Sequence, residues 1–333
     1  MTKFLSGKVI LITGATGSFG SNCVKYLLKN YSPKKIIVFS RDELKQSELQ
    51  NDIRSKKVRF FIGDIRDRYR LSMAMSNVDI VIHAAALKQV PAAEYNPYEC
   101  IQTNIIGAEN VIFAAIENNV KKVIALSTDK ASIPINLYGA TKLVSDKLFI
   151  AANNLVGQKK IRFSVVRYGN VIGSRGSIIP YFFQLLKDNS AFLPITHKEM
   201  TRFWITINEG IKFVLDSLHL MKGGEIFIPK MNSVKIVDVA KAIHPKAKIK
   251  IIGIRPGEKL HESMWSIDET KSIIEFKKYY LISPEIKFFD LKSSYAISNE
   301  KEKGKFINKE FVYSSINNSK FLNINQIKRV LSK

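Results

Sequence analysis

The sequence predicts an α/β protein with a doubly wound parallel sheet, and three observations favour this fold class. Short apolar runs of strand length alternate with helix-like segments through the first half of the chain. A glycine-rich turn joins the first apolar run to the first helical pattern. The chemically distinctive residues directly follow the apolar runs, and doubly wound folds bind their ligands at the carboxyl ends of the strands. We therefore expect one edge of the sheet to carry the functional site.

The first strand and the turn after it have the pattern of a dinucleotide-binding site. Residues 8–12 form a short apolar run, and TGATGSFG at 13–20 precedes a helical pattern that extends through Leu27. Such glycines allow a tight turn and a close approach of the backbone to a pyrophosphate at a helix N-terminus. The spacing is GxxGxxG rather than GxGxxG, and three glycines alone also fit an ordinary strand-to-helix turn. The predicted cofactor-binding residues of this turn are Gly14, Thr16, Gly17, Ser18, Phe19 and Gly20.

The end of the second predicted strand, residues 35–39, bears on the choice of cofactor. An NAD site usually has an acidic residue here for the ribose 2′-hydroxyl, whereas an NADP site uses arginine. Ser40 takes the place of the acid, Arg41 is next and Lys45 follows one helical turn later, so we predict that these residues bind NADP. Alternatively, Arg41 and Lys45 are solvated cations at the start of a helix, with Asp42–Glu43 serving its N-terminus.

The alternation continues up to Asn170 and becomes irregular beyond it. We expect further strands over residues 58–62, 78–83, 123–126 and 163–167, and helices over residues 97–118 and 138–153. This pattern predicts a Rossmann domain over residues 1–170, completed by about 203–230, and a smaller mixed α/β substrate-binding region over 171–202 and 231–333. The polar stretch 293–305 is expected to form a surface loop.

A tyrosine and three charged residues near the fifth predicted strand indicate catalysis. Tyr138 and Lys142 form a Tyr-x-x-x-Lys pair, which places both side chains on one face of a helix. The ammonium then favours the ionised phenol, so that the tyrosine can act as a base near neutral pH. Asp129 and Lys130 closely follow the 123–126 strand, although an isolated pair of this kind also fits a surface ion pair. Between a strand end and the Tyr-x-x-x-Lys pair, the Asp129–Lys130 pair indicates proton removal and loss of a leaving group in addition to alcohol oxidation.

The composition fits a globular enzyme. A chain of 333 residues with 46% hydrophobic residues can form one large or two coupled domains. It has no apolar stretch of about 18 residues or more, so no transmembrane helix is expected, and the first strand begins too early to leave room for a signal peptide. Cys23 and Cys100 show neither metal-ligand spacing nor a disulfide framework, so we expect no metal site and a reducing cytoplasm. His83 is expected to pack beneath the sheet end, and His261 has no assigned role.

The formal net charge of +23 has two interpretations. An excess of lysine can mark a nucleic-acid-binding protein. Here the cations are spread along the chain, and no zinc-finger, RNP or basic-helix motif is present. A nucleotide substrate and a phosphorylated cofactor would also exploit positive potential. We therefore expect neither a nucleic-acid nor a membrane partner.

The blocks that carry a family resemblance span residues 13–262. They are TGATGSFG at 13–20, FSRDELKQSE at 39–48, FFIGDIRD at 60–67, HAAALKQVPAAEYNP at 83–97, TNIIGAENV at 103–111, LSTDKASIPINLYGATKLVSDK at 126–147, VVRYGNVIGSRGSIIP at 165–180, MTRFWIT at 200–206 and IIGIRPGEKLHE at 251–262. In this order they resemble the inverting UDP-N-acetylglucosamine 4,6-dehydratases of the extended short-chain dehydrogenase/reductase family. Those enzymes open the bacterial pathway to pseudaminic acid, used in glycosylating flagellin or other surface glycans. The chain after about residue 270 resembles them less distinctively.

Three positions separate this branch from its relatives. Retaining dehydratases of the dTDP-glucose type resemble each other in having Asp-Glu where this chain has Asp129–Lys130, and simple 4-epimerases lack the acid–amine pair. A related dehydratase/5-epimerase branch has Met in place of Tyr138. Ser132 stands where relatives often have Ala, and the resemblance gives it no role. The alternatives to an inverting dehydratase are an NADP-dependent epimerase or reductase, a retaining dehydratase and a non-enzymatic NADP-binding relative.

The resemblance implies a mechanism with tightly bound NADP. Tyr138, ionised with help from Lys142, takes the proton of the sugar 4-hydroxyl as hydride leaves C4. Lys130 then removes the C5 proton, which requires a neutral amine and hence a lowered pKa. Asp129 starts as the acid and protonates the departing 6-hydroxyl, and Thr128 belongs to the same catalytic group. Return of hydride to C6 and protonation of C5 from the opposite face complete the inversion.

The resemblance also implies the remaining ligand contacts. Beyond the glycine turn and the 40–45 segment, the expected cofactor-binding residues are Asp64, Ile65, Ala84, Lys88, Ser127, Tyr138 and Lys142. The expected substrate-binding residues are Lys88, Asn170, Thr196, Arg202, Arg255 and Glu258. Arginine suits a diphosphate because its fork donates two parallel hydrogen bonds, although Arg202 also fits a helix start and Glu258 a partner for Lys259. The family implies a homo-oligomer, either a dimer or a hexamer.

Overall fold

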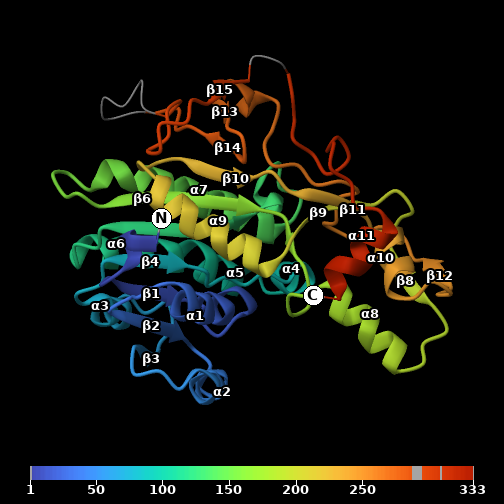
Figure 1. The fold of residues 1–333 in the computed structure, drawn as a ribbon, viewed down its shortest axis with the longest axis horizontal. Coiled ribbons are helices and arrows are strands. Elements are labelled where there is room, and N and C mark those ends of the chain that lie inside the picture. Colours follow the sequence, from blue (N-terminus) through green and yellow to red (C-terminus); the bar gives the residue numbers. More distant parts are fainter. Residues whose placement is uncertain (1, 287–294, 308–309, 333) are drawn as a thin grey trace.

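The computed structural model describes residues 2–286, 295–307 and 310–332, and a large sheet forms its centre (Figure 1). In sheet order its described strands are β3 (Val58–Ile62), β2 (Lys35–Ser40), β1 (Val9–Thr13), β4 (Ile80–His83), β5 (Lys122–Thr128), β6 (Arg162–Tyr168), β10 (Ile226–Pro229), β14 (Tyr279–Ile282), β13 (Ile273–Glu275) and β15 (Lys305–Phe306). The strands from β3 to β10 pair in parallel. Because the first six follow the order 3-2-1-4-5-6, the predicted doubly wound Rossmann sheet is confirmed.

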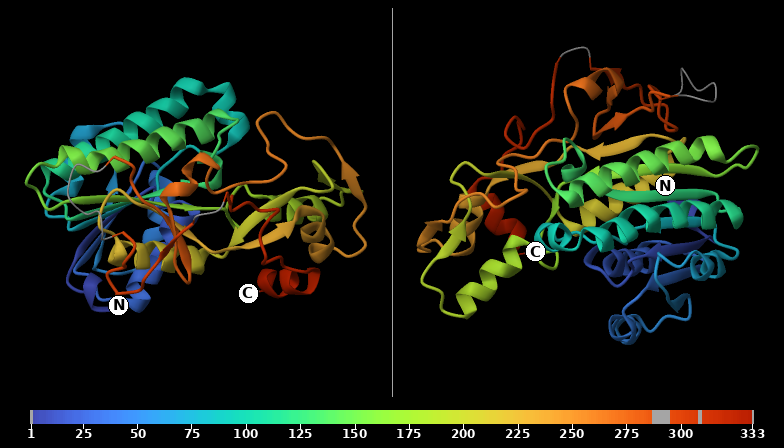
Figure 2. Two further views of the ribbon diagram at one scale, coloured as in Figure 1. Left: turned by 90° about the horizontal axis from the view of Figure 1, so that it is seen from above. Right: turned by 180° about the vertical axis from the view of Figure 1, so that it is seen from behind.

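Helices cover both faces of the parallel strands (Figure 2). On one face, α1 (Ser18–Asn30) packs against α9 (Ile207–Leu220). The other face carries three helices that contact one another in sequence, α3 (Arg68–Met75), α6 (Gly107–Glu117) and α7 (Leu137–Leu155). At the edge of the sheet, α2 (Glu43–Ile53) packs against β2 and β3. This arrangement leaves the carboxyl ends of the parallel strands free to carry a site.

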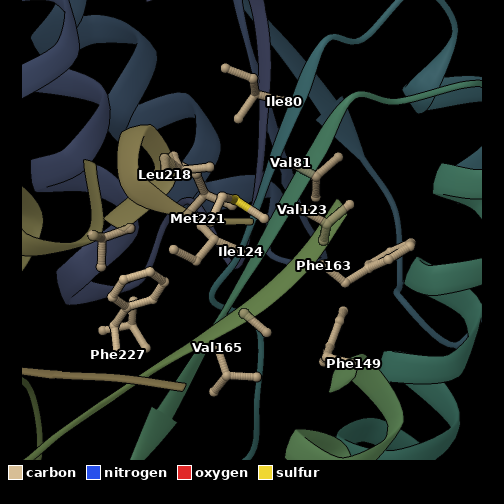
Figure 3. Packing of buried hydrophobic residues seen from close by; sticks show 14 of the residues in the cluster. Ile80, Val81, Val123, Ile124, Phe149, Phe163, Val165, Leu218, Met221 and Phe227 are labelled. Atoms are coloured by element: carbon tan, nitrogen blue, oxygen red, sulfur yellow. The ribbon is translucent and has the colours of Figure 1, made fainter. Parts of the chain in front are cut away.

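Alternating side chains of the central strands fill both layers between helices and sheet (Figure 3). Val123 of β5 and Phe163 of β6 are paired neighbours, and Phe163 packs against Phe149 of α7 with ring centroids 6.4 Å apart. Ile124 points to the opposite face, where Leu218 of α9 lies. These side chains are fully or almost fully buried, and each such burial stabilises the fold by about 1.5–3 kcal/mol. The core therefore holds in place the strand ends that carry the site.

The predicted elements of the first half are confirmed with small changes at their ends. The predicted strands correspond to β1 through β6, and the helix expected over residues 138–153 is α7. The helix expected over residues 97–118 consists of α5 (Pro97–Ile101), a π-helical turn η2 (Gln102–Ile106) and α6. Before it stands the short helix α4 (Val90–Tyr95).

The smaller region beyond β6 is a mixed α/β structure, as expected, and lies at the right of Figure 1. Its described elements are β7 (Asn170–Val171), α8 (Ile178–Lys187), β8 (Leu193–Ile195), β9 (Thr201–Ile205), β11 (Asn232–Lys235), α10 (Ile236–Ile243), β12 (Ile249–Ile251) and α11 (Ile324–Leu331). β11, β9 and β7 form one small sheet, and β12 pairs with β8. Two small apolar clusters hold the helices of this region against its strands.

The domain limits stay a prediction, to which the strand pairing adds detail. Within the 203–230 segment, β10 joins the large sheet and α9 packs against its strands β5 and β6. β9, from the same segment, belongs to a small sheet instead. β13, β14 and β15 come from the predicted substrate-binding region but extend the large sheet. Of the expected 293–305 loop, residues 293–294 lie outside the described residues, Tyr295 is buried, and β15 begins at Lys305. No helix in the described part of the chain is long and apolar enough to cross a membrane.

Candidate active site

A cleft of about 740 Å³ opens at the carboxyl ends of the parallel strands, and residues of the smaller region complete its wall. Its volume is typical of a small-molecule site. All the predicted catalytic and ligand-binding residues line it except Asp129 and Thr196. They come from distant parts of the sequence, and the parallel sheet brings them to one edge.

The glycine-rich turn between β1 and α1 forms a cradle in which two glycines allow close backbone packing. Gly14 has a φ of +63°, and a Cβ atom there would lie 2.8 Å from Ala85 Cα. A Cβ atom on Gly20 would lie 2.5 Å from Ala15 Cα. Gly17 caps α1 without a side-chain hydrogen bond, so the first amide groups of the helix are available to an anion. The cradle therefore fits a pyrophosphate.

The end of β2 holds the residues predicted to select NADP. Ser40 is buried and its hydroxyl accepts a hydrogen bond from a glutamine of α2, while the Arg41 guanidinium lies 3.5 Å from Asp64 Oδ2. Asp42 caps α2 by accepting a hydrogen bond from Lys45 N over 2.9 Å, and its carboxylate also pairs with the Lys45 ammonium. Both cations line the cleft, but each already has an acidic partner.

The acid of the pair after β5 is buried and its amine is half-buried, so the pair is not the exposed surface ion pair considered as its alternative. Asp129 is fully buried in the short 3-10 helix η3 (Asp129–Ala131). Its Oδ1 accepts hydrogen bonds from Thr128 Oγ1 over 2.9 Å and from Lys130 Nζ over 3.1 Å. Its Oδ2 has no hydrogen-bond partner among the described residues. A buried carboxylate oxygen without a partner is costly, so this atom is a candidate for an interaction with a ligand.

The pKa of Lys130 is raised, so the expectation of a lowered pKa is wrong. Burial lowers it, but the carboxylates of Asp129 and Glu262 together outweigh burial and raise it above its ordinary value. Glu262 Oε1 lies 3.4 Å from Lys130 Nζ. The Arg202 charge acts in the expected downward direction but does not reverse the result. The site therefore holds Lys130 as an ammonium.

Tyr138 and Lys142 lie one turn apart on α7, but the phenol is not ionised as readily as expected. Burial raises the pKa of Tyr138 to about 12, although the Lys130 charge and a hydrogen bond with Thr128 act in the opposite direction. Lys142 is itself buried, and burial lowers its pKa despite the nearby charge of Asp146. The prediction that Lys142 brings the phenol pKa near neutral is wrong for the protein alone, because burial dominates and Lys130 is the most effective cation.

Buried polar contacts support the floor of the cleft. Ser127, expected to contact the cofactor, donates a hydrogen bond to Asp146 Oδ2 over 2.8 Å, and the same oxygen lies 3.1 Å from Arg167 Nη2. His83 packs beneath the sheet end as expected, with Nδ1 2.8 Å from Thr13 Oγ1. Burial and the charge of the α7 lysine lower the pKa of His83 to about 3. The histidine is therefore a neutral structural group at ordinary pH.

Two predicted substrate residues stand where the Rossmann sheet meets the smaller region. Lys88 Nζ donates to the Arg175 carbonyl oxygen over 3.0 Å, and the Arg175 amide donates to Ser18 Oγ over 3.1 Å. This chain of contacts joins the 84–88 loop, the segment before α8 and the glycine turn. Asn170 Oδ1 is buried and has no hydrogen-bond partner among the described residues, so it is available to a ligand donor.

The remaining predicted substrate residues divide into two groups. Arg202 lies in β9, not at a helix start, and its guanidinium is 3.5 Å from Glu258, so that this acid pairs with Arg202. Both residues and Arg255 line the cleft. Thr196 does not, and its hydroxyl instead lies 3.1 Å from Met200 Sδ. The prediction of a substrate contact from Thr196 therefore has no support in the geometry.

The polar cleft residues that sequence reasoning missed include Glu262, Thr103 and Ser177. Each has a buried side-chain oxygen without a hydrogen-bond partner among the described residues. Their signal was position, because Glu262 ends the IIGIRPGEKLHE block and Thr103 begins TNIIGAENV. Residue type alone did not distinguish them from structural polar residues.

The fold and the Tyr-x-x-x-Lys cleft define an extended short-chain dehydrogenase/reductase. The chain belongs to the family described as "Polysaccharide biosynthesis protein", which residues 10–284 match. The UDP-N-acetylglucosamine 4,6-dehydratase (inverting) of Campylobacter jejuni is 60% identical over 313 residues, which cover 94% of each chain. The resemblance found in the sequence blocks is therefore confirmed.

Two further matches widen the comparison. A UDP-glucose 4-epimerase of Rickettsia bellii is 41% identical over 331 residues, covering 97% of this chain and 95% of the relative. The X-ray structure of Pen from Bacillus thuringiensis superimposes with a TM-score of 0.89 at 35% identity, over 99% of this chain and 98% of the other. The whole chain, including the smaller region, thus shares its fold with a solved protein.

Proposed function

We propose that this chain is a UDP-N-acetylglucosamine 4,6-dehydratase that inverts C5 and yields UDP-2-acetamido-2,6-dideoxy-β-L-arabino-hex-4-ulose. The observation that carries the proposal is the ion pair of the buried Asp129 with the half-buried Lys130 beside Tyr138, with one Asp129 oxygen lacking a partner among the described residues. Oxidation at C4 needs only the tyrosine, whereas elimination of water across C5 and C6 also needs a base and an acid. The 60% identity to the Campylobacter jejuni dehydratase supports this activity.

The similarity to the Rickettsia bellii epimerase makes 4-epimerisation the second candidate. That reaction leaves the 6-hydroxyl in place, and it gives Asp129 and Lys130 no proton to transfer at C5 or O6. The ion pair between the buried Asp129 and Lys130, which lines the cleft, therefore favours dehydration.

The cleft fits a nicotinamide dinucleotide, and we propose NADP. The glycine cradle would hold its pyrophosphate, since the first amide groups of α1 are not capped by a side chain. Arg41 would bind the 2′-phosphate. The phosphate would then compete with the Asp64 carboxylate for the Arg41 guanidinium. When bound, this cofactor accepts a hydride from C4 of the sugar and returns it to C6.

Tyr138 is proposed to take the proton of the sugar 4-hydroxyl. Burial works against this role, because the pKa of the phenol is about 12 and ionisation needs positive charge nearby. The Lys130 charge already lowers the pKa, and Lys142, on the same helix as Tyr138, also lines the cleft. The first proton transfer is therefore coupled to the charge of Lys130.

The Asp129–Lys130 pair already contains the proton that elimination requires. It is an ion pair with 3.1 Å between Nζ and Oδ1. Transfer of one proton from the ammonium to the carboxylate gives a neutral amine and a carboxylic acid without changing the number of protons on the pair. The amine then takes the C5 proton, the acid protonates O6, the C6–O6 bond breaks and water leaves. Proton transfer from Lys130 to Asp129 thus supplies the neutral amine, and a lowered Lys130 pKa is not required.

We propose that Lys88, Asn170, Arg202, Arg255 and Glu258 bind the UDP-sugar, since all five line the cleft. The arginines suit the diphosphate and the Glu258 carboxylate suits ribose hydroxyls. Delivery of a solvent-derived proton to C5 from the face opposite Lys130, together with release of the O4 proton from Tyr138, would then give the inverted product and restore the site. We further propose that the product enters pseudaminic acid synthesis for flagellin or surface glycans, in the cytoplasm, and that the enzyme is a dimer or hexamer.

Incubation with UDP-N-acetylglucosamine in D2O, followed by proton NMR, tests the proposal. The expected product has a C6 methyl signal, deuterium at C5 and the L-arabino configuration. A 4-epimer with an intact 6-hydroxymethyl group would establish the epimerase instead. A methyl signal with retained C5 configuration would establish a retaining dehydratase.

A further inference from the structure

Glu262 is a buried acid for which the proposed steps have no task. Its side chain is only 2% exposed, and Oε1 lies 3.4 Å from Lys130 Nζ and 4.0 Å from Arg202 Nε. Oε2 lies 3.8 Å from Lys259 Nζ and accepts no hydrogen bond from the described residues. A carboxylate in such a place is retained only when nearby cations offset its desolvation.

The backbone of Glu262 is fixed, so the position of its carboxylate is set by the fold. Its amide donates to Ser315 Oγ over 3.0 Å, and the Ser315 amide donates to the Glu262 carbonyl oxygen over 2.7 Å. Ser315 Oγ also lies 2.7 Å from Thr201 Oγ1, next to Arg202 on β9. A segment from the C-terminal part of the chain thus holds Glu262 against Lys130.

The Lys130 ammonium lies between two carboxylates from different parts of the chain. Asp129 on η3 accepts its hydrogen bond at 3.1 Å, and Glu262 faces it at 3.4 Å. Among the described residues, four other titratable groups are close enough for their pKa to be coupled to that of Lys130. They are Arg202 of β9, Tyr138 of α7, Lys88 of the loop after β4 and Lys259. Glu262 is therefore the second negative charge against a group of cations.

We propose that Glu262 is a positioning residue that holds the Lys130 ammonium against Asp129 and sets the pH range in which the pair keeps the one proton it shares. This inference rests on the proposed function, in which Lys130 is the C5 base. The proton moves between Lys130 Nζ and an Asp129 oxygen, breaking an N–H bond and forming an O–H bond, while Glu262 keeps its charge. If the pair loses this proton, Asp129 can no longer protonate O6.

The proposal predicts the direction of a pH shift. A negative charge close to a protonated pair opposes loss of the proton, so Glu262 extends the active range toward alkaline pH. In Glu262→Gln this charge is gone, and the alkaline limb of kcat/KM for UDP-N-acetylglucosamine should move down by about one pH unit or more. Glu262→Asp should restore most of the wild-type profile. A purely structural role would instead lower activity equally at every pH.

A matched control separates local from general effects of charge removal. Glu275 pairs with Lys230 at a more exposed site and does not line the cleft. Glu275→Gln should leave the alkaline limb unchanged. An unshifted limb in Glu262→Gln, or an equal shift in both variants, would overturn the proposal.

A second measurement does not depend on the substrate. In protein labelled with ¹³C at lysine Cε, the Lys130 signal is identified by its loss in Lys130→Arg, and its titration is followed by NMR. The wild-type signal should stay that of an ammonium through the range where exposed lysines titrate, and Glu262→Gln should bring its midpoint down. If UDP-N-acetylglucosamine is not turned over but this midpoint still moves, the proposed function fails and the coupling stands. If turnover is normal and the midpoint does not move, the role of Glu262 is refuted while the proposed function stands.

Discussion

The glycine cradle and the acid–amine corner lie at the same edge of the sheet but are built by different means. The cradle comes from one short turn, in which Gly14 and Gly20 allow backbone contacts that any Cβ would prevent. The corner comes from charges on separate segments, with Lys130 between Asp129 and Glu262. The first is a matter of local backbone geometry and the second of long-range electrostatics. The difference teaches that a local motif shows where a ligand binds, whereas the reaction depends on charges that only the fold brings together.

Loss of the proposed base should give the largest effect. It should abolish the chemistry of the acid–amine corner and leave cofactor binding at the glycine cradle intact. Lys130→Ala should reduce formation of the 6-deoxy product by about 10²–10⁴-fold, as removal of a general acid–base group typically does. Oxidation at C4 should still occur, but more slowly, because the Lys130 charge that lowers the Tyr138 pKa is gone. Reduced cofactor should therefore accumulate, as measured by its nicotinamide absorbance. Tyr138→Phe is the control and should give no reduced cofactor. Near-normal turnover of Lys130→Ala would show that another group removes the C5 proton.

Reversal of the charge after β2 should act on the cradle side only. In Arg41→Asp, a charge-assisted hydrogen bond to the 2′-phosphate is replaced by repulsion, and such bonds contribute about 1.5–3 kcal/mol. Retained NADP should therefore fall about tenfold or more, as measured by mass spectrometry of nucleotide released from purified protein. Arg68→Asp, which alters an exposed pair with Glu117 outside the cleft, is the matched control. Mostly NAD in the wild-type protein would refute the choice of NADP.

Two glycines with the same backbone strain should separate crowding from conformation. Gly14 and Gly7 both have positive φ, +63° and +71°, but a Cβ on Gly14 would meet Ala85 at 2.8 Å whereas one on Gly7 would meet nothing within 4 Å. Gly7→Ala should cost about 1–2 kcal/mol of stability and keep its cofactor. Gly14→Ala should be less stable than that and lose bound cofactor, as measured by thermal unfolding and nucleotide content. Equal behaviour of the two variants would remove crowding as the reason for Gly14.

The histidine beneath both regions should give the smallest effect. Its pKa is lowered from 6.5 to about 3, so between these values the unfolded chain binds a proton that the folded protein does not. The stability contributed by neutral His83 is complete above pH 6.5 and is lost as pH falls toward 3, by at most about 1.4 kcal/mol per pH unit. Urea unfolding of wild type and His83→Gln between pH 6.5 and 5 measures this slope. A variant as pH-sensitive as the wild type would assign the effect to other groups.

Much of the fold and the cradle could be predicted from the sequence because their causes are local. Apolar runs of strand length, each followed by a helical pattern, predict β1 through β6, and TGATGSFG predicts the turn. The spacing of Tyr138 and Lys142 predicts one face of α7. The extension of the large sheet by β13, β14 and β15 was not predicted, since these short strands depend on pairing with β10 rather than on a pattern of their own.

The charge states of the corner could not be predicted, because they depend on depth and distance. Burial raises the pKa of Tyr138, and acids that include the distant Glu262 raise that of Lys130. Neither effect is visible in residue spacing. Thr196 shows the opposite failure, because its position near the family blocks suggested a substrate contact, whereas its hydroxyl faces Met200.

A single hydrogen bond joins Asp129 and Lys130. On the proposed mechanism, it allows the pair to exchange protons only internally and with the substrate during the elimination step. The ammonium gives its proton to the carboxylate, the carboxylate gives one to O6, and the amine regains one from C5. The pair returns to its starting charges without exchanging a proton with bulk water. Because Asp129 is fully buried, the proton that it carries for O6 is shielded from bulk water during the elimination step.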